Sequence, residues 1–260
     1  MRELFDEAAN RSNSNPMQAA QRAARAVQRK RFYQDTGVGE ADGGFTVTLD
    51  GKAIKTPSGR TVIVPVRSLA ETIAAEWNAQ GEVIDPTTMP ATRFANSVAQ
   101  GVTDNAQAVA DDVAKYFGSD LLFYRAGHPE GLVAREAEHW DPILFWAAET
   151  LGAHFMLAEG GMHVRQPDPA IAAACGALPD DPWAIAAVHV ITTVTGSALL
   201  ALALSHRVID PDQAWAAAHV DEDWNAEQWG VDEEAAARKA AKLVDFNAAT
   251  GVLKALHQGA

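Results

Sequence analysis

The first regular pattern along the chain alternates hydrophobic and polar residues, which is the period of a strand with one buried face. Residues 45–49 read FTVTL, and the Asp50-Gly51 pair that follows suits a type I′ hairpin turn, because both central residues of that turn need positive φ. A second turn, PSGR at 57–60, leads into another apolar run. We therefore predict a small antiparallel sheet over residues 31–67.

From Ser68 the hydrophobic period changes to that of a helix. Ser68 and Glu71 have the spacing of a capping box, and apolar residues recur every four positions after them. Farther on, Asp181-Pro182 and Asp210-Pro211 each place a capping residue before a proline, which suits the first position of a helix. The same period predicts further helices over 94–117, 130–151, 182–206, 211–229 and 232–256.

The order of these elements, strands first and helices after, is typical of an α+β protein. We predict a small N-terminal antiparallel β domain followed by a larger, mainly α-helical domain. The chain then divides into a basic N-terminal arm (1–30), the β domain (31–67) and the helical domain (68–260). A doubly wound dinucleotide-binding fold is disfavoured, because strands and helices do not alternate.

The charge of the chain argues against nucleic acid as a partner. The 21 Lys and Arg face 34 Asp and Glu, so the net charge is −13, which phosphate would repel. The N-terminal arm is an exception, since residues 1–31 hold seven basic and three acidic side chains. The remainder of the chain is correspondingly more acidic.

One segment is long and apolar enough to raise the question of a membrane span. Residues 183–205 contain no charged side chain over 23 positions, but polar residues and Gly196 interrupt their middle. We predict one or two buried helices here and no membrane insertion. The single cysteine, Cys175, fits a reducing compartment, and no signal peptide is visible. We expect the bacterial cytoplasm, with the mitochondrial matrix as the alternative.

A search for catalytic motifs finds no phosphate-binding loop, nucleophile elbow or metal-ligand spacing. We therefore predict no catalytic residue, no metal site and no cofactor. One stretch is nevertheless unusual, the segment WAAAHVDEDWNAEQWG at 215–230. On a single helix, Trp215, Glu222 and Trp229 would lie on one stripe, with a carboxylate among apolar side chains. Glu222 could be a general acid or base, an ion-pair partner of Arg93 or Arg125, or the polar centre of a protein-binding surface.

A second unusual stretch is KYFGSDLLFYRAGHPEGL at 115–132. Asp120 and Arg125 flank an apolar run there and could pair across the end of a buried segment. We predict that Asp120, Arg125 and Arg93 form structural ion pairs or contact a partner.

Several segments together resemble the assembly chaperones of the F1-ATPase head of ATP synthase, which bind its free α subunit. The resemblance spans about 31–253. Its segments are, in order, RFY, LDGKAIKTP, LAETIAAEWNAQ, IDPTTMPATR, YFGSDLLFYRAGHPEGL, WDPILFW, GSALLALAL and EDWNAEQWG.

This resemblance implies a non-enzymatic chaperone that shields the subunit interface of free α subunit before assembly and that is monomeric when free. In the family the acidic residue before the W-G pair is tied to function, and by position this is Glu222. We expect the partner-binding residues to be Glu222, Trp215, Trp224, Trp229 and Asp223. The resemblance also implies that Glu136 stands where glutamine is common. The alternative function is a small-molecule hydrolase or isomerase with Glu222 as general base.

Overall fold

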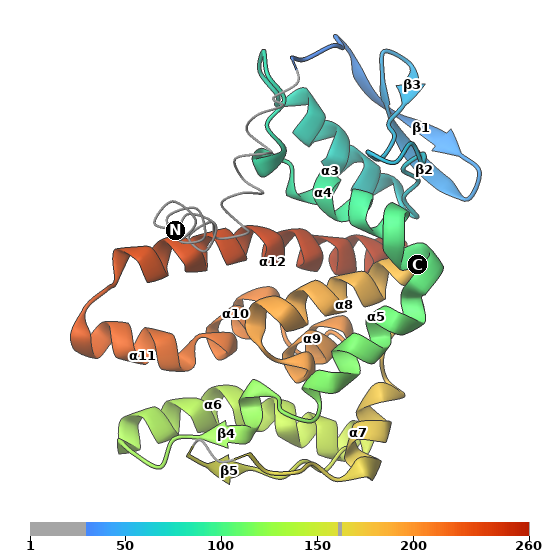
Figure 1. The fold of residues 1–260 in the computed structure, drawn as a ribbon. Coiled ribbons are helices and arrows are strands. Elements are labelled where there is room, and N and C mark those ends of the chain that lie inside the picture. Colours follow the sequence, from blue (N-terminus) through green and yellow to red (C-terminus); the bar gives the residue numbers. More distant parts are fainter. Residues whose placement is uncertain (1–29, 161–162, 260) are drawn as a thin grey trace, which may run out of the picture.

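The computed structural model describes residues 30–160 and 163–259. Near the N-terminus, β1 (Thr36–Ala41), β2 (Gly44–Leu49) and β3 (Lys52–Ala53) form an antiparallel sheet in the order β1-β2-β3, and helices follow along the rest of the chain (Figure 1). The predicted α+β fold is confirmed. Apart from Lys30, the predicted basic arm lies outside the described residues, and the division of the chain into domains stays a prediction.

The turn between β2 and β3 has the predicted geometry. Asp50 and Gly51 have φ of 48° and 78°. Val47 and Leu49 of β2 are buried and Phe45 is half-buried, as the alternation predicted, but Thr46 is buried as well. Its hydroxyl is satisfied, because it donates a hydrogen bond to the backbone oxygen of Val62 at 2.7 Å. The run after residue 60 contacts the sheet through isolated bridges such as Phe45–Val64 and forms no strand of its own.

Helix α3 (Arg67–Asn78) packs across the sheet (Figure 1). The capping-box prediction at its start is wrong, because the helix already begins at Arg67 and no side chain caps it. Ser68 therefore lies inside the first turn. Leu69 and Ile73 are buried, as their spacing predicted.

The connection to the helical part is not the single helix predicted over 94–117. It consists of η1 (Pro86–Thr88), α4 (Pro90–Ser97), the π-helical turn η2 (Val98–Val102) and α5 (Thr103–Tyr116). Asn105 adds a kink at the start of α5, with φ of −138° and ψ of 32°. The helical direction changes here, where the sheet-bearing end of the molecule meets the rest.

The long apolar segment forms two core helices, α8 (Pro182–Thr195) and α9 (Ala198–Ser205). Asp181 caps α8 by accepting hydrogen bonds from two amides, as predicted, and Gly196 ends the helix at a φ of 76°. α8 packs against α5, α9 and α12. Within the described residues no helix has both the length and the hydrophobicity that a bilayer crossing demands.

The remaining elements surround this core (Figure 1). The prediction of a helix over 130–151 is met by α6 followed by a π-helical turn, and Pro142 lies inside α6 without ending it. The elements are η3 (Leu121–Phe123), β4 (Tyr124–Arg125), α6 (Glu130–Trp146), η4 (Ala147–Leu151), β5 (Ala158–Glu159, parallel to β4), α7 (Asp168–Cys175), α10 (Pro211–Ala218), α11 (Val220–Trp229) and α12 (Glu233–Gly259).

Candidate interaction surface

The sequence predicted a single helix through the heptad-spaced tryptophans. The structure instead has two helices there, α10 and α11, which are separated at His219. His219 has φ of −122° and ψ of 17°. Its ring Nδ1 donates a hydrogen bond to the backbone oxygen of Trp215 at 2.8 Å. In a continuous helix that oxygen would accept from the amide of His219, which instead donates to the oxygen of Ala216 at 3.1 Å. The side chain thus competes with the helical hydrogen bond, and the helix breaks.

The break removes Trp215 from the predicted stripe. Trp215 is half-buried, with its ring centroid 4.0 Å from that of His219 and 5.0 Å from that of Phe246. Glu222 and Trp229 both remain in α11, two turns apart on the same side of the helix. The expected surface is therefore reduced to these two residues and their exposed neighbours.

Glu222 does not lie among apolar side chains. Its side chain is 63% exposed, and its Oε2 is 3.9 Å from Nε2 of the buried His219. Burial lowers the pKa of His219, so its ring is neutral at neutral pH. Because Nδ1 carries the ring proton, Nε2 has no hydrogen to donate to Glu222. The carboxylate of Glu222 is thus available to a partner.

The two arginines proposed as internal partners of Glu222 pair with other acids. Arg93 contacts Asp245 at 2.8 Å, which joins α4 to α12, and Arg125 contacts Asp141 at 2.6 Å, which joins β4 to α6. The hypothesis that Glu222 pairs with Arg93 or Arg125 is therefore wrong.

Asp120 is buried and does not pair with Arg125. Its two oxygens accept hydrogen bonds from the amides of Leu122 at 3.1 Å and Leu199 at 3.0 Å. Burial raises the pKa of Asp120 to about 6. This acid fastens η3 to the start of α9, inside the molecule.

Two ion pairs fix α11 to its neighbours. Asp223 pairs with Lys239 of α12, and Glu227 accepts two hydrogen bonds from Arg135 of α6 at 2.8 and 2.9 Å. The guanidinium of Arg135 also lies over the ring of Trp224, 5.1 Å from its centroid. Asp223 and Trp224, which the sequence assigned to the partner, are thus already engaged within the chain.

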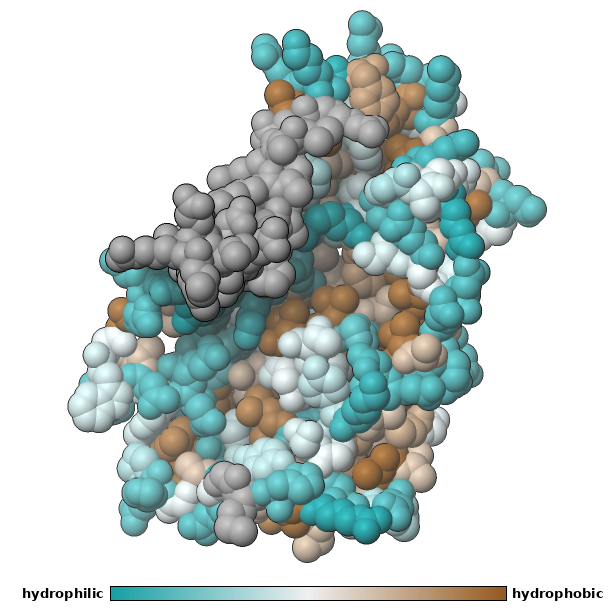
Figure 2. Space-filling view, in the orientation of Figure 1, coloured by the Kyte–Doolittle hydropathy of each residue, from teal (hydrophilic) through white to brown (hydrophobic). Residues whose placement is uncertain are grey.

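The end of α11 and the turn that follows it expose large apolar side chains. Trp229 is 86% exposed at the end of α11, and Val231 is 72% exposed in the turn to α12. The surroundings are acidic, and Figure 2 shows mainly hydrophilic side chains over α11. α11 and the first half of α12 form a hairpin at one side of the molecule (Figure 1). A large exposed aromatic residue beside free carboxylates is typical of a protein-binding surface.

Beneath this surface lies a pair of acids that the sequence analysis did not connect. Glu136 of α6 is buried, accepts a hydrogen bond from the amide of Ala126 at 2.9 Å and faces Asp221 of α11. Burial first, and then the carboxylate of Asp221, raise the pKa of Glu136. Oδ1 of Asp221 is buried without a donor among the described residues. A proton held on Glu136 would give this pair of acids a hydrogen-bond donor.

In the part of the chain that the structure describes, the surface around Glu222 lacks the features of a catalytic site for a small molecule. Across residues 30–160 and 163–259, no group of three or more His, Cys, Asp or Glu side chains could hold a metal ion. The side chain of Glu222 is 63% exposed on α11, whereas a general base is normally held in a concave pocket that surrounds its substrate. The arrangement is better suited to binding a protein surface.

Comparison with known proteins gives consistent similarities. The sequence pattern of the ATP12 chaperone protein family matches residues 30–148. A crystal structure of a candidate chaperone from Agrobacterium tumefaciens is 50% identical, with a TM-score of 0.83 over 87% of this chain and 86% of that one. The structure of Atp12 from Paracoccus denitrificans is 38% identical, with a TM-score of 0.81 over 86% of this chain and 97% of that one.

A more distant similarity connects the chain to a eukaryotic protein. The mitochondrial protein atp12 of Schizosaccharomyces pombe is 21% identical over 221 residues, covering 79% of this chain and 75% of its own length.

Proposed function

The chain belongs to the ATP12 chaperone family, and we propose that it assists assembly of the F1 sector of ATP synthase by binding the free α subunit. It covers the surface that the α subunit later gives to its neighbours. An exposed apolar surface of this kind self-associates unless it is covered. The protein acts as a binding partner and not as an enzyme, either in a bacterial cytoplasm or in a mitochondrial matrix.

The observation that carries this proposal is the exposed pair on α11. Trp229 supplies a large apolar anchor, and the free carboxylate of Glu222 lies two turns away on the same side of the helix. A cation on the α subunit pairs with Glu222, and a wrong partner without that cation leaves the acid unpaired.

The ion pairs of Asp223 and Glu227 support the same role. They hold α11 against α12 and α6 before the partner arrives, so less conformational entropy is lost on binding. Release requires no nucleotide, because an incoming subunit that needs the same surface of the α subunit displaces the chaperone by competition.

Charge reversal at Glu222 tests the proposal. We expect the purified chain to co-elute with isolated α subunit and not with β subunit, and Glu222→Lys to abolish this co-elution. Circular dichroism and melting temperature should stay unchanged, because the side chain of Glu222 is 63% exposed and its ion-pair contact among the described residues is a 3.9 Å approach to His219. Trp229→Ala should weaken binding by about tenfold or more, since exposed tryptophans are frequent hot spots.

Glu149→Lys is the matched control. Glu149 is also exposed but lies in η4, and its substitution should leave co-elution intact. If the unchanged protein fails to retain the α subunit, the proposed function is rejected. If Glu222→Lys retains it normally, the acid does not contact the partner.

A further inference from the structure

A second surface, remote in sequence from α11, is a groove of about 820 Å³ between the β2–β3 hairpin and the end of α3. All of its lining residues fall between positions 32 and 96. The segments RFY, LDGKAIKTP, LAETIAAEWNAQ and IDPTTMPATR, which carry much of the family resemblance, each contribute to the lining. The groove is thus built from segments that lie apart along the chain and meet only in the fold.

One wall of the groove is aromatic. Phe32 is 66% exposed, and its ring packs edge-on against Tyr33 with centroids 5.4 Å apart. Tyr33 in turn contacts Trp77 at 5.6 Å and donates a hydrogen bond from its hydroxyl to the backbone oxygen of Trp77 at 2.6 Å. This support holds Phe32 on a rigid base while its outer face stays in water. An exposed, rigidly supported aromatic side chain is suited to anchor an apolar side chain of another molecule.

The rim of the groove is basic, although the chain as a whole is acidic. Lys52 and Lys55 are exposed, and no carboxylate lies within ion-pair distance of either among the described residues. Asp50 also lines the groove; hydrogen bonds from the amides of Asp35 at 2.9 Å and Gln34 at 3.0 Å, with the nearby charge of Lys52, lower its pKa, so the groove carries two cations and one carboxylate. With a net charge of −13 the molecule as a whole repels an acidic polypeptide, whereas the ammonium groups of Lys52 and Lys55 attract carboxylates.

The groove offers side chains and not a free sheet edge. The amide of Ile54 donates to the oxygen of Val47 at 2.9 Å, and the amide of Val62 donates to the oxygen of Ile54 at 3.1 Å. Because the chain at Ile54 is paired on both sides, a partner cannot add a strand there. Recognition must depend on the aromatic wall and the lysines.

We propose that this groove binds an acidic segment of a partner polypeptide. An apolar side chain of that segment packs against Phe32 and Trp77, and flanking carboxylates pair with Lys52 and Lys55. The proposal does not depend on the identity of the partner, nor on the role of Glu222.

A peptide titration tests this directly. The chain has seven tryptophans, whose indole N–H groups give separate resonances in a ¹⁵N-labelled sample, and Trp77→Phe assigns the resonance of Trp77. We expect the acetylated and amidated hexapeptide DELFED to shift the Trp77 resonance in a saturable manner and to leave that of Trp229 in place. The peptide KKLFKK, with the same apolar pair and opposite charge, should leave both in place.

Variants of the groove identify the groups involved. Lys52→Glu with Lys55→Glu should weaken DELFED binding by roughly tenfold or more, whereas Lys254→Glu, an exposed lysine of α12, should not. Phe32→Ser should weaken binding, whereas Phe145→Ser, at a position 67% exposed on α6, should not.

The proposal is overturned if DELFED at millimolar concentration leaves the Trp77 resonance unmoved, or if KKLFKK shifts it equally. Since both peptides are titrated into the unchanged protein, this result does not depend on how the variants fold. Loss of α subunit binding in Glu222→Lys, with peptide binding intact, would separate the two surfaces.

Discussion

At the scale of single residues, Glu136 is a buried acid that faces a second acid, Asp221, so a side chain that donates a hydrogen bond would suit this position better. Its Oε2 accepts a hydrogen bond from the amide of Ala126, and its carboxyl group also faces Asp221, whose buried Oδ1 has no donor within the described part of the chain. A glutamine, which the family resemblance implies is common at this position, would accept from Ala126 and donate to Asp221 without a proton from solvent. The acid achieves the same only when protonated.

Glu136→Gln should therefore stabilise the protein at neutral and higher pH. The pKa of Glu136 is raised above its ordinary value of 4.5, so its stabilising contribution is complete below about pH 4.5 and is lost as the pH rises through the raised pKa. We expect the variant to gain about 1 kcal/mol in free energy of unfolding at pH 8, with the difference shrinking toward pH 4. Urea denaturation across this range measures it.

Glu138→Gln is the matched control for this variant. Glu138 lies on the exposed side of the same helix, and its substitution should leave the pH dependence of the free energy of unfolding unchanged. A gain from Glu136→Gln that stays constant from pH 4 to pH 8 would show that no proton is shared with Asp221.

At the scale of elements, the position of α11 depends on its contact with α6. Gly131, at the start of α6, leaves room for the ring of Trp224, and a Cβ at this position would lie 2.6 Å from Cη2 of that ring. Arg135, one turn farther along α6, covers the same ring and binds Glu227. Gly131 and Arg135 of α6 thus form the contact surface for the ring of Trp224 of α11.

Gly131→Ala should displace the Trp224 ring. An alanine ordinarily stabilises a helix by up to about 1 kcal/mol relative to glycine, but here the added methyl overlaps the indole, which we expect to reverse the gain. Gly251→Ala is the matched control, because Gly251 lies inside α12, where an added methyl group would meet no side chain within 4 Å. Denaturation should place Gly131→Ala about 1–3 kcal/mol below Gly251→Ala.

Tryptophan fluorescence gives a second measurement of the same change. We expect the emission of Gly131→Ala to move to longer wavelength, as the Trp224 ring becomes more exposed, and that of Gly251→Ala to stay unchanged. Equal stability and equal emission in the two variants would contradict the packing described for α11 on α6.

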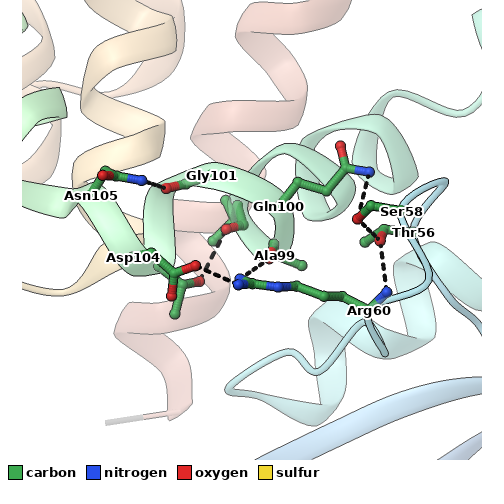
Figure 3. A network of polar contacts seen from close by, with 10 residues as sticks. Thr56, Ser58, Arg60, Ala99, Gln100, Gly101, Asp104 and Asn105 are labelled. Carbon is green, nitrogen blue, oxygen red and sulfur yellow. Dashed lines mark hydrogen bonds and ion pairs between the residues drawn. The ribbon is translucent and has the colours of Figure 1, made fainter.

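At the scale of the whole molecule, the sheet-bearing end joins the helical part through η2 and the start of α5. Figure 3 shows how Arg60, in the turn after β3, reaches across this connection: it donates to the backbone oxygen of Ala99 at 3.0 Å and pairs with Asp104 at 2.5 Å. Gln100 contacts Ser58 in the same network. The long helix α12 also bridges the two ends, because it packs against α8 and against α3 and α4.

Arg60→Ala should loosen this connection with little effect on global stability. Both partners of the Arg60–Asp104 pair are about half exposed, at 50% and 54%, so the loss in free energy of unfolding should be below about 1 kcal/mol. Amide hydrogen exchange in residues 98–105 should become faster, since the π turn loses its fixed contact. Arg165→Ala, which removes the exposed pair with Asp168, should leave that exchange unchanged. Unchanged exchange in Arg60→Ala would mean that α12 alone holds the two ends.

The sequence by itself determined the class of fold and most of its elements. Strand alternation, the Asp50-Gly51 turn and the helix caps at Asp181 and Asp210 are local features, which short-range hydrogen bonds and burial of one face stabilise. The apolar run of α8 and α9 likewise required burial. The family resemblance also came from short segments, and the comparisons confirmed it.

The tertiary structure decided which side chains are free to act. Heptad spacing placed Trp215 with Glu222, but the ring of His219 took the backbone oxygen that a continuous helix needs. Residue spacing also does not predict which acid each arginine contacts, because Arg93 reaches Asp245 only when α4 packs against α12, and Arg125 reaches Asp141 only when β4 lies against α6. Partner choice, burial and the raised pKa of Glu136 arise from contacts between different elements, and no local pattern encodes those contacts.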